Sequence, residues 1–465
     1  MTRHIAYPAY LTGLSIVRGA GARPMRQLRR FQELARSEPA VWQAYRNGLL
    51  SELLTHALRE IPFYRGLPGE LYALALEAPL QALQGFPVLT KADVQSHEKE
   101  LLARDHSPLQ LRSDYTGGST GSPTRFWHDR RRIAVRLLGT YRDMAYSGWR
   151  LGDRMAFIEA PRGMYWMRSA FLRAANRWTG ACVGLNVFHM DPHSNREFLA
   201  AMEVTRPAVL WVIASGAHEF AAFAESEGIS PRLHALDLKA IILTCDRLLP
   251  FQRERVERVF NAPVFDLYGS HDTGIIATEC AGHHGRHVPA DNVFVEILDD
   301  EGRPVPPGMP GRIVVTDLWN RGFAVIRYDV ADVGHFLRED IPCPCGVTFP
   351  RIAPPDGRVS DFLTLRDGTR LHGDVFSHLL YGLPGLRRFQ VIQEVPSEAV
   401  LLCQGNPKAI EPALRQRLKK LPAGLDVRVE FCDEIPRTGA GKRQYVISHV
   451  SPPTYLGPPS QQPTL

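Results

Sequence analysis

The spacing of apolar residues changes along the chain, and each change predicts a different kind of element. Between residues 25 and 60 apolar residues recur every three or four positions, which predicts helices with one buried face. Pro62 and the Arg65–Gly66 stretch end that run. The charged and polar segment 92–107 suits an exposed connection.

The middle of the chain contains short continuous apolar runs separated by helical patterns. The runs at 208–214, 240–244 and 263–269 predict buried strands. Stretches with helical spacing lie between them at 217–226 and 250–260. Buried strands that alternate with helices predict a parallel sheet with helices on its faces.

The following part of the chain has the pattern of strands joined by turns. Runs at 293–298 and 312–318 predict two strands, separated by an Asp-Glu-Gly turn and a loop rich in proline and glycine. Proline and glycine at 354–357 then mark a domain boundary.

The last part of the chain predicts a small α+β domain. It contains strand-like runs at 389–394, 399–403 and 426–432 and a helix-like stretch at 407–420.

We therefore predict an α/β fold with two domains. The large N-terminal domain, 1–357, would contain parallel sheets and helices, and the small α+β C-terminal domain would cover 358–450. Residues 451–465 are rich in proline and are expected to be disordered.

The composition narrows the class of protein. Of 465 residues, 44% are apolar and 22% are charged, a globular balance that excludes wholesale disorder and a coiled coil. A net charge of +6 over this length is too small to indicate nucleic-acid binding. Seven cysteines do not make a disulfide scaffold, so a reduced, cytoplasmic setting is expected.

Neither a membrane span nor a leader is favoured by the apolar pattern. No apolar run reaches the ~18 residues that a membrane-spanning helix needs. Residues 5–17 invite a targeting interpretation, but Pro8, Thr12 and Gly13 interrupt them. A leading helix or hairpin that packs on the main domain is therefore favoured over a secretory signal.

Tyr115–Thr124 (YTGGSTGSPT) is the first segment with candidate chemistry. Glycines let backbone N–H groups turn inward, and hydroxyls add donors, so the segment can form a nest for phosphate oxygens. A flexible linker is the alternative, but the flanking aromatics Tyr115, Phe126 and Trp127 favour a packed loop. The segment lacks the Gly-Lys-Ser/Thr ending of the usual P-loop.

Tyr268–Gly274 (YGSHDTG) directly follows the third predicted parallel strand. Ligands of open α/β sheets bind beyond the carboxyl ends of the strands. An acidic residue at such a position suits Mg²⁺. The alternative is an ordinary turn with an aspartate cap.

Two further segments indicate little on their own. Asp332, in Arg327–Gly334, is placed to accept the hydroxyls of a ribose, and the alternative is a surface hairpin with a paired Arg and Asp. Lys442 lies on the glycine-rich loop Ile435–Arg443, where its charge would stabilise a developing oxyanion. The alternative for that loop is a solvated basic surface.

Taken in order, these segments resemble those of the adenylate-forming (acyl/aryl-CoA synthetase) superfamily, and within it the phenylacetate-CoA ligase and CapK branch. The resemblance covers almost the whole chain, from about residue 40 to 450. It implies nucleotide-binding roles for residues in five segments. These are Thr116, Gly117, Gly118, Ser119, Thr120, Gly121 and Thr124 in the phosphate loop, Asp246 on the adenine side, Tyr268, Gly269 and Ser270 after the third strand, Asp332 at the ribose, and Arg358 at a hinge.

The resemblance implies a two-step reaction with ATP and Mg²⁺. A carboxylate attacks the α-phosphorus and gives an acyl-adenylate and pyrophosphate, with Asp272 at the metal and Lys442 bridging the carboxylate and the α-phosphate. A mobile C-terminal domain then rotates, withdraws Lys442 and admits coenzyme A as the acceptor. Two alternatives stay open: transfer of the acyl group to an amine or to the hydroxyl of a sugar, and a degenerate nucleotide-binding scaffold without catalysis. A homodimer is left open as well.

Three positions depart from the family pattern. Asp272 stands where the metal-binding acid is normally Glu, and Thr244-Cys245-Asp246 replaces the usual Gly-Glu-like segment on the adenine side. Ser360 stands at a hinge position that is usually acidic. Such changes would fit an unusual acceptor or slower adenylation.

The acyl pocket is expected between the strand ends and the phosphate loop. No lysine or arginine is evident there, which favours an apolar or aromatic acid. The candidate lining residues are Ala214, Ser215, Tyr268 and Gly269, with Tyr141 or Trp211 as aromatic neighbours.

Cysteines and histidines also form a candidate metal site. Thiolate and imidazole suit tetrahedral Zn²⁺, and both occur in 280–287 (CAGHHGRH) and 343–346 (CPCG). Chance cysteines in loops are the alternative. The resemblance implies a structural Zn²⁺ site of four ligands, with His283 or His284 as substitutes for the histidine. These ligands are Cys280, His287, Cys343 and Cys345.

Overall fold

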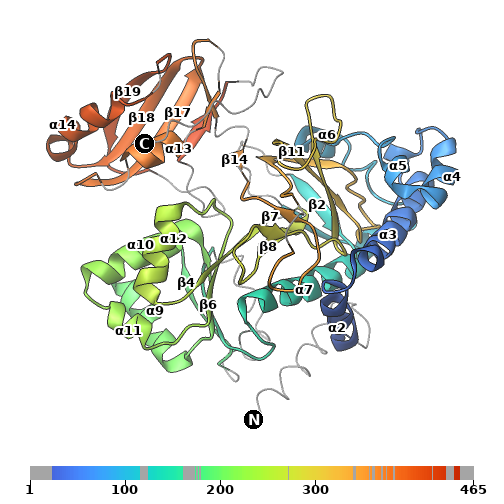
Figure 1. Cartoon of the computed structure of the whole chain (residues 1–465), viewed down its shortest axis with the longest axis horizontal. Helices are drawn as coiled ribbons and strands as arrows, with labels where there is room; N and C mark the ends of the chain where they lie inside the picture. The colour runs from blue at the N-terminus through green and yellow to red at the C-terminus, as the bar shows by residue number, and fades with distance from the viewer. Residues whose placement is uncertain are drawn as a thin grey trace.

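The computed structural model of the chain is shown in Figure 1. It describes residues 24–115, 124–160, 173, 176, 180–270, 272–338, 342–355, 357–358, 362–367, 370–372, 374–380, 383–421, 423–435 and 445–450. The predictions made for 5–17 and 451–465 lie outside these residues.

Among the N-terminal helices, α4 (Glu70–Glu77) and α5 (Pro79–Leu83) pack on α3 (Pro39–Glu60). By contrast, α2 (Pro24–Leu34) packs on α7 (Arg130–Met144), and α6 (Lys91–Ser96) packs on β12 (Tyr328–Gly334). The helices predicted over 25–60 are therefore present as α2 and α3. Val41 belongs to the apolar residues between 25 and 60 for which the spacing predicts a buried face, but it is 53% exposed. The reason is geometric: successive residues lie about 100° apart around a helix, and the neighbouring Trp42 is the buried one.

An eight-stranded sheet forms the centre of the larger part of the molecule (Figure 1). Its order is β13–β9–β8–β7–β6–β5–β3–β4, with the last five strands parallel and the first three joined by antiparallel pairing. The strands predicted at 208–214, 240–244 and 263–269 are β5, β6 and β7. The bounds are β3 Met155–Glu159, β4 Cys182–Asn186, β5 Val209–Ile213, β6 Ala240–Thr244, β7 Val264–Ser270, β8 Gly274–Glu279, β9 Arg286–His287 and β13 Arg351–Ile352.

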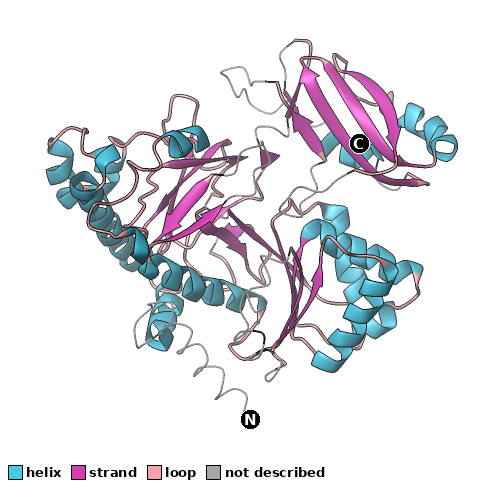
Figure 2. Cartoon of the chain, turned by 180° about the vertical axis from the view of Figure 1, so that it is seen from behind, coloured by secondary structure: helices cyan, strands magenta, loops and turns pink. Residues whose placement is uncertain are grey.

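The two faces of the parallel strands are buried against different layers. Leu210 and Val212 pack with α9 (Pro192–Thr205) and its neighbouring helices, whereas Val209 packs with residues of α3 and α7 (Arg130–Met144). Alternate side chains of a strand point to opposite faces, so both faces are apolar and the strands read as continuous apolar runs. The helices on the first face, seen together in Figure 2, are α9, α10 (Ala214–Ser226), α11 (Ser230–His234) and α12 (Pro250–Phe260).

A second, antiparallel sheet lies beside the first and has the order β10–β11–β12–β14. It contains the strands predicted at 293–298 and 312–318. A separate hairpin pairs two strands on either side of the glycine-rich segment. The bounds are β10 Val293–Leu298, β11 Gly311–Asp317, β12 Tyr328–Gly334 and β14 Gly357–Arg358 in the sheet, and β1 Arg112–Tyr115 and β2 Arg125–His128 in the hairpin.

The C-terminal part has a hydrophobic core of its own, and its elements match the predicted α+β pattern. Its four-stranded sheet has the order β19–β18–β17–β20. Two polar contacts join it to the larger part: Arg388 to Glu219 at 3.2 Å, and Gln252 Nε2 to the Tyr445 hydroxyl at 3.5 Å. The elements are β15 Phe362–Thr364, β16 Arg370–His372, α13 Asp374–Leu380, β17 Leu386–Val395, β18 Glu398–Gly405, α14 Pro407–Leu418, β19 Asp426–Cys432 and β20 Val446–Ser448.

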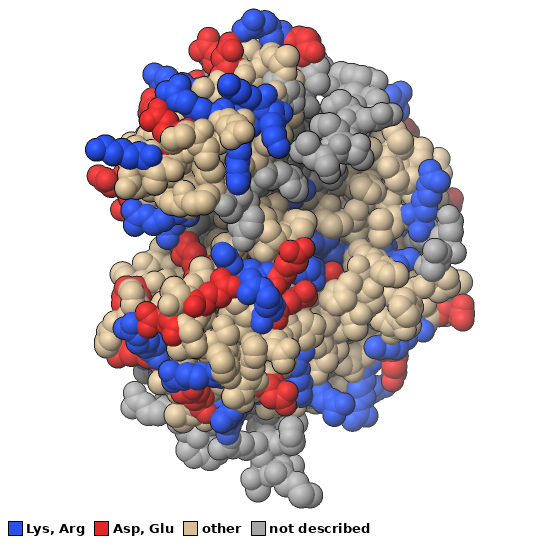
Figure 3. Space-filling view, turned by 60° about the vertical axis from the view of Figure 1, so that its left-hand side comes forward, with Lys and Arg blue, Asp and Glu red and all other residues tan. Residues whose placement is uncertain are grey.

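The predicted fold class is thus confirmed, and the boundary at 357/358 stays a prediction. Within the described part of the chain, no helix combines the length and apolarity that crossing a bilayer demands. Positive and negative side chains are interspersed on the face shown in Figure 3. This mixture agrees with the small net charge.

Candidate active site

The candidate active site lies at the carboxyl ends of β5, β6 and β7, where parallel strands of an open sheet present their ligands. Ser215 follows β5 at the start of α10, and Asp246 follows β6. The Ser215 hydroxyl donates to Asp246 Oδ2 at 2.6 Å. Two residues predicted from separate segments, one for the acyl pocket and one for the adenine side, are therefore in contact.

Tyr268 and Asp332 are the second predicted pair that the fold brings together. The Tyr268 hydroxyl donates to Asp332 Oδ2 at 2.7 Å across a sequence separation of 64 residues. Asp332 lies on β12, where it is the register partner of Arg358 on β14. The predicted ribose acid thus contacts the predicted nucleotide motif and faces the backbone of the predicted hinge.

Asp272, the predicted metal-binding acid, lies next to this pair. The Tyr328 hydroxyl donates to Asp272 Oδ2 at 3.3 Å. Arg136, on α7, is half-buried nearby, and desolvation lowers its pKa to about 10, with the like charge of Arg132 as the next cause and Asp272 among the carboxylates that oppose it. Asp272 therefore lies in the field of a half-buried guanidinium.

The backbone around the site is held in uncommon conformations. Gly269 lies at a register shift between β7 and β8, and a side-chain Cβ there would come within 2.5 Å of the Gly274 carbonyl oxygen, so the position requires glycine. Cys245, Arg327 and Ala331 have φ values of +73°, +54° and +62°. Left-handed conformations of non-glycine residues cost energy and cluster at functional sites.

The glycine-rich segment connects β1 and β2, whose register pairs Tyr115 with Arg125. Thr124 is buried at the end of this connection. The other residues predicted for the phosphate loop lie outside the described residues, as do Ser360 and Lys442. Their roles stay predictions.

The remaining candidates for the acyl pocket occupy two places. Ala214 is fully buried at the start of α10, and Trp211 on β5 donates from Nε1 to Glu159 at 3.1 Å. Tyr141 lies in the core, where its ring stacks on Trp149 at 5.3 Å. Ala214 therefore lies at the carboxyl end of β5 and Trp211 in the middle of that strand, and Tyr141 packs within the layer that covers the sheet.

Arginines on α7 support the loop after β7, and the sequence analysis did not find them. Buried Arg132 forms an ion pair with Asp317 and donates to the carbonyl of Thr273. The Thr273 N–H donates to the Ser270 hydroxyl at 3.1 Å. The available signal was a run of three arginines at 130–132 in a helix that otherwise buries one face.

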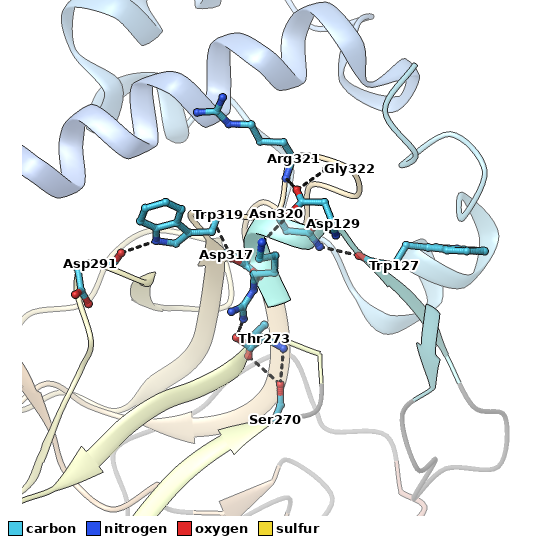
Figure 4. Close-up of polar contacts among 11 residues, drawn as sticks. Trp127, Asp129, Ser270, Thr273, Asp291, Asp317, Trp319, Asn320, Arg321 and Gly322 are labelled. Carbon is cyan, nitrogen blue, oxygen red and sulfur yellow. Dashed lines mark hydrogen bonds and ion pairs between the residues drawn. The ribbon is translucent and has the colours of Figure 1, made fainter. Parts of the chain in front are cut away.

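Asp129, the N-cap of α7, connects this support to the loop after β11 (Figure 4). One carboxylate oxygen accepts the Arg132 N–H at 2.7 Å, and the other accepts the N–H groups of Arg321 and Gly322 at 2.8 and 3.2 Å. The amide of Asn320 completes the link by donating to the Trp127 carbonyl at 2.7 Å. A single side chain thus ties together two segments that lie far apart in the sequence.

The predicted cysteine–histidine cluster is also assembled by the fold. The ligand atoms of Cys280, His287, Cys343 and Cys345 all lie within 4.8 Å of one another. The Sγ atoms of Cys280 and Cys343 are 3.4 Å apart, and Cys345 Sγ is 3.3 Å from His287 Nε2. His287 Nδ1 is 3.2 Å from the carbonyl of Phe349, which fixes the ring with Nε2 toward the cysteines. His283 instead pairs with Glu279 at 3.1 Å.

Comparisons with known proteins agree with this geometry. The family model described as AMP-binding enzyme matches residues 89–319. A phenylacetate-coenzyme A ligase of Thermus thermophilus is 26% identical over 353 residues, which cover 72% of this chain and 74% of the relative. Protein CapK of Staphylococcus aureus is 21% identical, over 78% of this chain and 80% of the relative.

Solved structures show the same fold. A 2-hydroxyisobutyryl-CoA ligase in complex with its acyl-adenylate superposes with a TM-score of 0.69 at 20% identity, over 87% of this chain and 88% of that chain. An anthranilate CoA ligase in complex with anthranoyl-AMP gives a TM-score of 0.52 at 18% identity, over 71% and 64%. The motifs, the fold and the matched relatives together support the superfamily of adenylate-forming, AMP-binding enzymes for this chain.

Proposed function

We propose that this protein is an AMP-forming ligase that activates a carboxylic acid with ATP and transfers the acyl group to coenzyme A. In the first step a carboxylate oxygen bonds to the α-phosphorus of ATP and pyrophosphate leaves. In the second step the thiol of coenzyme A attacks the acyl carbon and AMP leaves. The thiol proton passes to solvent.

The observation that carries this proposal is the contact between Tyr268 and Asp332 at the carboxyl edge of the sheet. A ribose needs acceptors for its two hydroxyls, and a carboxylate supplies both. The Tyr268 bond orients the Asp332 carboxylate, and the Ser215–Asp246 contact lies at the adjoining strand ends. The nucleotide would therefore lie across the ends of β5, β6 and β7, with its phosphates toward the loop between β1 and β2.

The acid at the phosphates is Asp272. A carboxylate that follows a strand and is held by the Tyr328 hydroxyl offers the oxygen ligand that Mg²⁺ prefers. The Mg²⁺ that accompanies ATP would offset the charge of its phosphates. Arg136 adds a half-buried positive charge on the same side of the site.

The transition state would be stabilised by Lys442. Its ammonium would interact with the attacking carboxylate and the α-phosphate oxygens as negative charge builds there. Removal of this lysine by rotation of the C-terminal domain would then clear the path for the thiol. The Arg388–Glu219 ion pair between the two parts is partly exposed and therefore inexpensive to break.

The acid is proposed to be apolar or aromatic. We assign Ala214, which follows β5, and Trp211, in the middle of β5, to the acyl pocket. Glu159 beside Trp211 disfavours a second carboxylate on the substrate. The relatives named above include a phenylacetate ligase and an anthranilate ligase, which supports an aromatic acid.

A structural Zn²⁺ is proposed for the cysteine–histidine cluster. Three thiolates and one imidazole nitrogen at mutual distances below 4.8 Å fit the donor set and the tetrahedral geometry of closed zinc sites. The ion would join the turn after β8 to the segment before β13 and would hold no substrate.

The test is carboxylate-dependent exchange of pyrophosphate into ATP with a panel of apolar, aromatic and hydroxy acids. Exchange with at least one acid, and an acyl-adenylate detected by mass spectrometry, is the expected result. Folded, zinc-loaded protein that binds ATP and exchanges with no acid would favour the non-catalytic scaffold instead.

The acceptor is tested by product analysis with and without coenzyme A. A thioester that forms only with coenzyme A is expected. The CapK relative keeps transfer to an amine or a sugar as the second candidate, and adenylate formation without thioester formation would favour it.

A further inference from the structure

A second group of metal-ligating side chains lies away from the candidate active site, at the C-terminal end of α3 and in the segment after α6. It consists of His56, Asp105 and His106, whose ligand atoms lie within 4.8 Å of one another. His106 Nδ1 is 2.7 Å from one oxygen of Asp105, and His56 Nε2 is 3.6 Å from the other. The two rings are nearly parallel, with an angle of 19° and centroids 6.1 Å apart. One carboxylate therefore stands between two imidazoles.

His56 is the member of this group that needs a partner. It is only 6% exposed, and neither of its ring nitrogens has a hydrogen-bond partner among the described residues. The 3.6 Å separation from Asp105 is too long for a hydrogen bond. An unpaired buried polar group costs about 1–3 kcal/mol, so an imidazole in this position gains from any ligand that occupies its lone pair.

The backbone that carries the group is fixed by hydrogen bonds. The Arg104 N–H donates to the Glu60 carbonyl at 2.9 Å, and the Ala103 N–H donates to the Gly322 carbonyl at 3.1 Å. The segment after α6 is thus tied both to the end of α3 and to the loop after β11. Binding an ion would require adjustment of side chains alone, because the two carrier segments are already held together.

The group opens onto a cleft of about 560 Å³. Four arginines and four carboxylates line this cleft, and their formal charges cancel, so a cation is not repelled. Three protein ligands leave coordination positions that water or a small anion can take from the cleft. Two imidazoles and one carboxylate suit a first-row transition ion such as Zn²⁺, whereas Mg²⁺ and Ca²⁺ prefer oxygen ligands throughout.

We propose that His56, Asp105 and His106 bind a zinc-class divalent ion at a site separate from both the nucleotide and the cysteine–histidine cluster. Metal–nitrogen bonds of about 2 Å require ligand atoms about 3.3 Å apart. The two His–Asp separations, 2.7 and 3.6 Å, are close to this value, and all the ligand atoms lie within 4.8 Å of one another. The site keeps open coordination positions toward the cleft, unlike the four-ligand cluster.

The test is a titration of metal-stripped full-length protein with Co²⁺, followed by absorption spectroscopy and by counting bound metal. Ions at the cysteine–histidine cluster give intense thiolate-to-cobalt charge-transfer absorption, and ions at a site of imidazole and carboxylate do not. We expect a second equivalent of Co²⁺ that adds no thiolate absorption. The two sites are thereby counted separately, so failure of the zinc cluster would not affect this result.

The variants are His106→Asn and Asp105→Asn, both at partly exposed positions, with circular dichroism to verify folding. Each variant should bind the Co²⁺ equivalent that adds no thiolate absorption at least about tenfold more weakly, because loss of even an outer-shell partner of a metal ligand costs that much affinity. The thiolate absorption should stay unchanged. His193→Asn is the matched control, since His193 pairs with Glu197 at 3.3 Å on the surface outside this group.

The proposal is overturned if the wild-type chain binds no thiolate-free equivalent. It is equally overturned if folded His106→Asn and Asp105→Asn bind that equivalent as tightly as the wild-type chain, or if His193→Asn loses it.

Discussion

The strand-end site and the cysteine–histidine cluster lie at opposite ends of the same strand, β8, and they are built in opposite ways. At the beginning of β8, charged and hydroxyl groups such as Asp272 and Tyr268 are half-buried. At its end, Cys280 and His287 are about 1% exposed. The first site keeps polar groups where a ligand can reach them, and the second encloses its donors. We therefore expect changes at the first site to affect activity and changes at the second to affect stability.

The largest expected effect is on activity. Lys442→Ala should reduce acyl-adenylate formation by about 10³-fold, since one electrostatic partner of a developing charge is typically worth 10²–10³. Pyrophosphate exchange measures the loss, and thermal unfolding should stay unchanged. Lys420→Ala, which removes an exposed lysine of the same domain, is the control. An undiminished exchange rate in the Lys442 variant would refute the assigned role.

The next effect is on stability. Cys343→Ala should lower the free energy of unfolding by about 3 kcal/mol, because the energy of a structural metal contributes directly to folding. A chelator should destabilise the wild-type chain by at least this amount and should destabilise the variant less, because the variant has already lost the ion of the cluster. Denaturant unfolding measures both.

Cys403→Ala is the control for that experiment. Cys403 is buried, as Cys343 is, but lies in the core of the C-terminal part. Its variant should lose packing alone and remain sensitive to the chelator. If chelation leaves the wild-type midpoint where it was, the cluster does not hold a structural ion.

The third prediction concerns the pH dependence of stability, through a histidine on one of the helices that pack on the sheet. Burial, helped by the positive charge of Arg255 and opposed by Glu219 and Glu225, lowers the pKa of His218 on α10 to about 4. The unfolded chain takes up a proton near pH 6.5 and the folded protein does not, so stability falls as the pH falls from 6.5 toward 4.

Between pH 7.5 and 4.5 the free energy of unfolding should fall by about 2 kcal/mol less in His218→Gln than in the wild-type chain. Urea unfolding at the two pH values measures it, with His234→Gln on the exposed face of α11 as the control. An identical loss in the His218 variant and the wild-type chain would assign the acid sensitivity to other groups.

The smallest expected effect concerns orientation at the ribose. Tyr268→Phe removes the bond to Asp332 and should raise the KM for ATP about tenfold, with a change in stability of about 1 kcal/mol or less. Steady-state exchange kinetics separate KM from kcat. Tyr72→Phe, on α4 and away from the site, should change neither.

Much of the fold and several site contacts were predictable from the sequence. Continuous apolar runs identified β5, β6 and β7, because strands buried on both faces leave no polar position to interrupt the run. A resemblance of ordered motifs pointed to Asp246, Asp332 and Tyr268, whose roles stay predictions. The fold places Asp246 in contact with Ser215 and Tyr268 in contact with Asp332.

The supporting contacts were not predictable, because they depend on the third dimension. Arg132 and Asp317 lie 185 positions apart, and no local pattern connects them. His56 lies on the buried face of α3, so its spacing indicates a core residue. Segment 92–107 was predicted to be an exposed connection, although it carries two residues of the proposed ion site. Polar residues that meet only in the folded structure produce no periodic pattern in the sequence.

The cap of α7 has a consequence for biosynthesis. Asp129 receives backbone donors that follow it by 192 and 193 positions, so the helix leaves the ribosome long before the residues that complete its cap are translated. Contacts of such long range slow folding. The nascent chain is therefore expected to need the loop at 320–322 outside the exit tunnel before its first half reaches its final form.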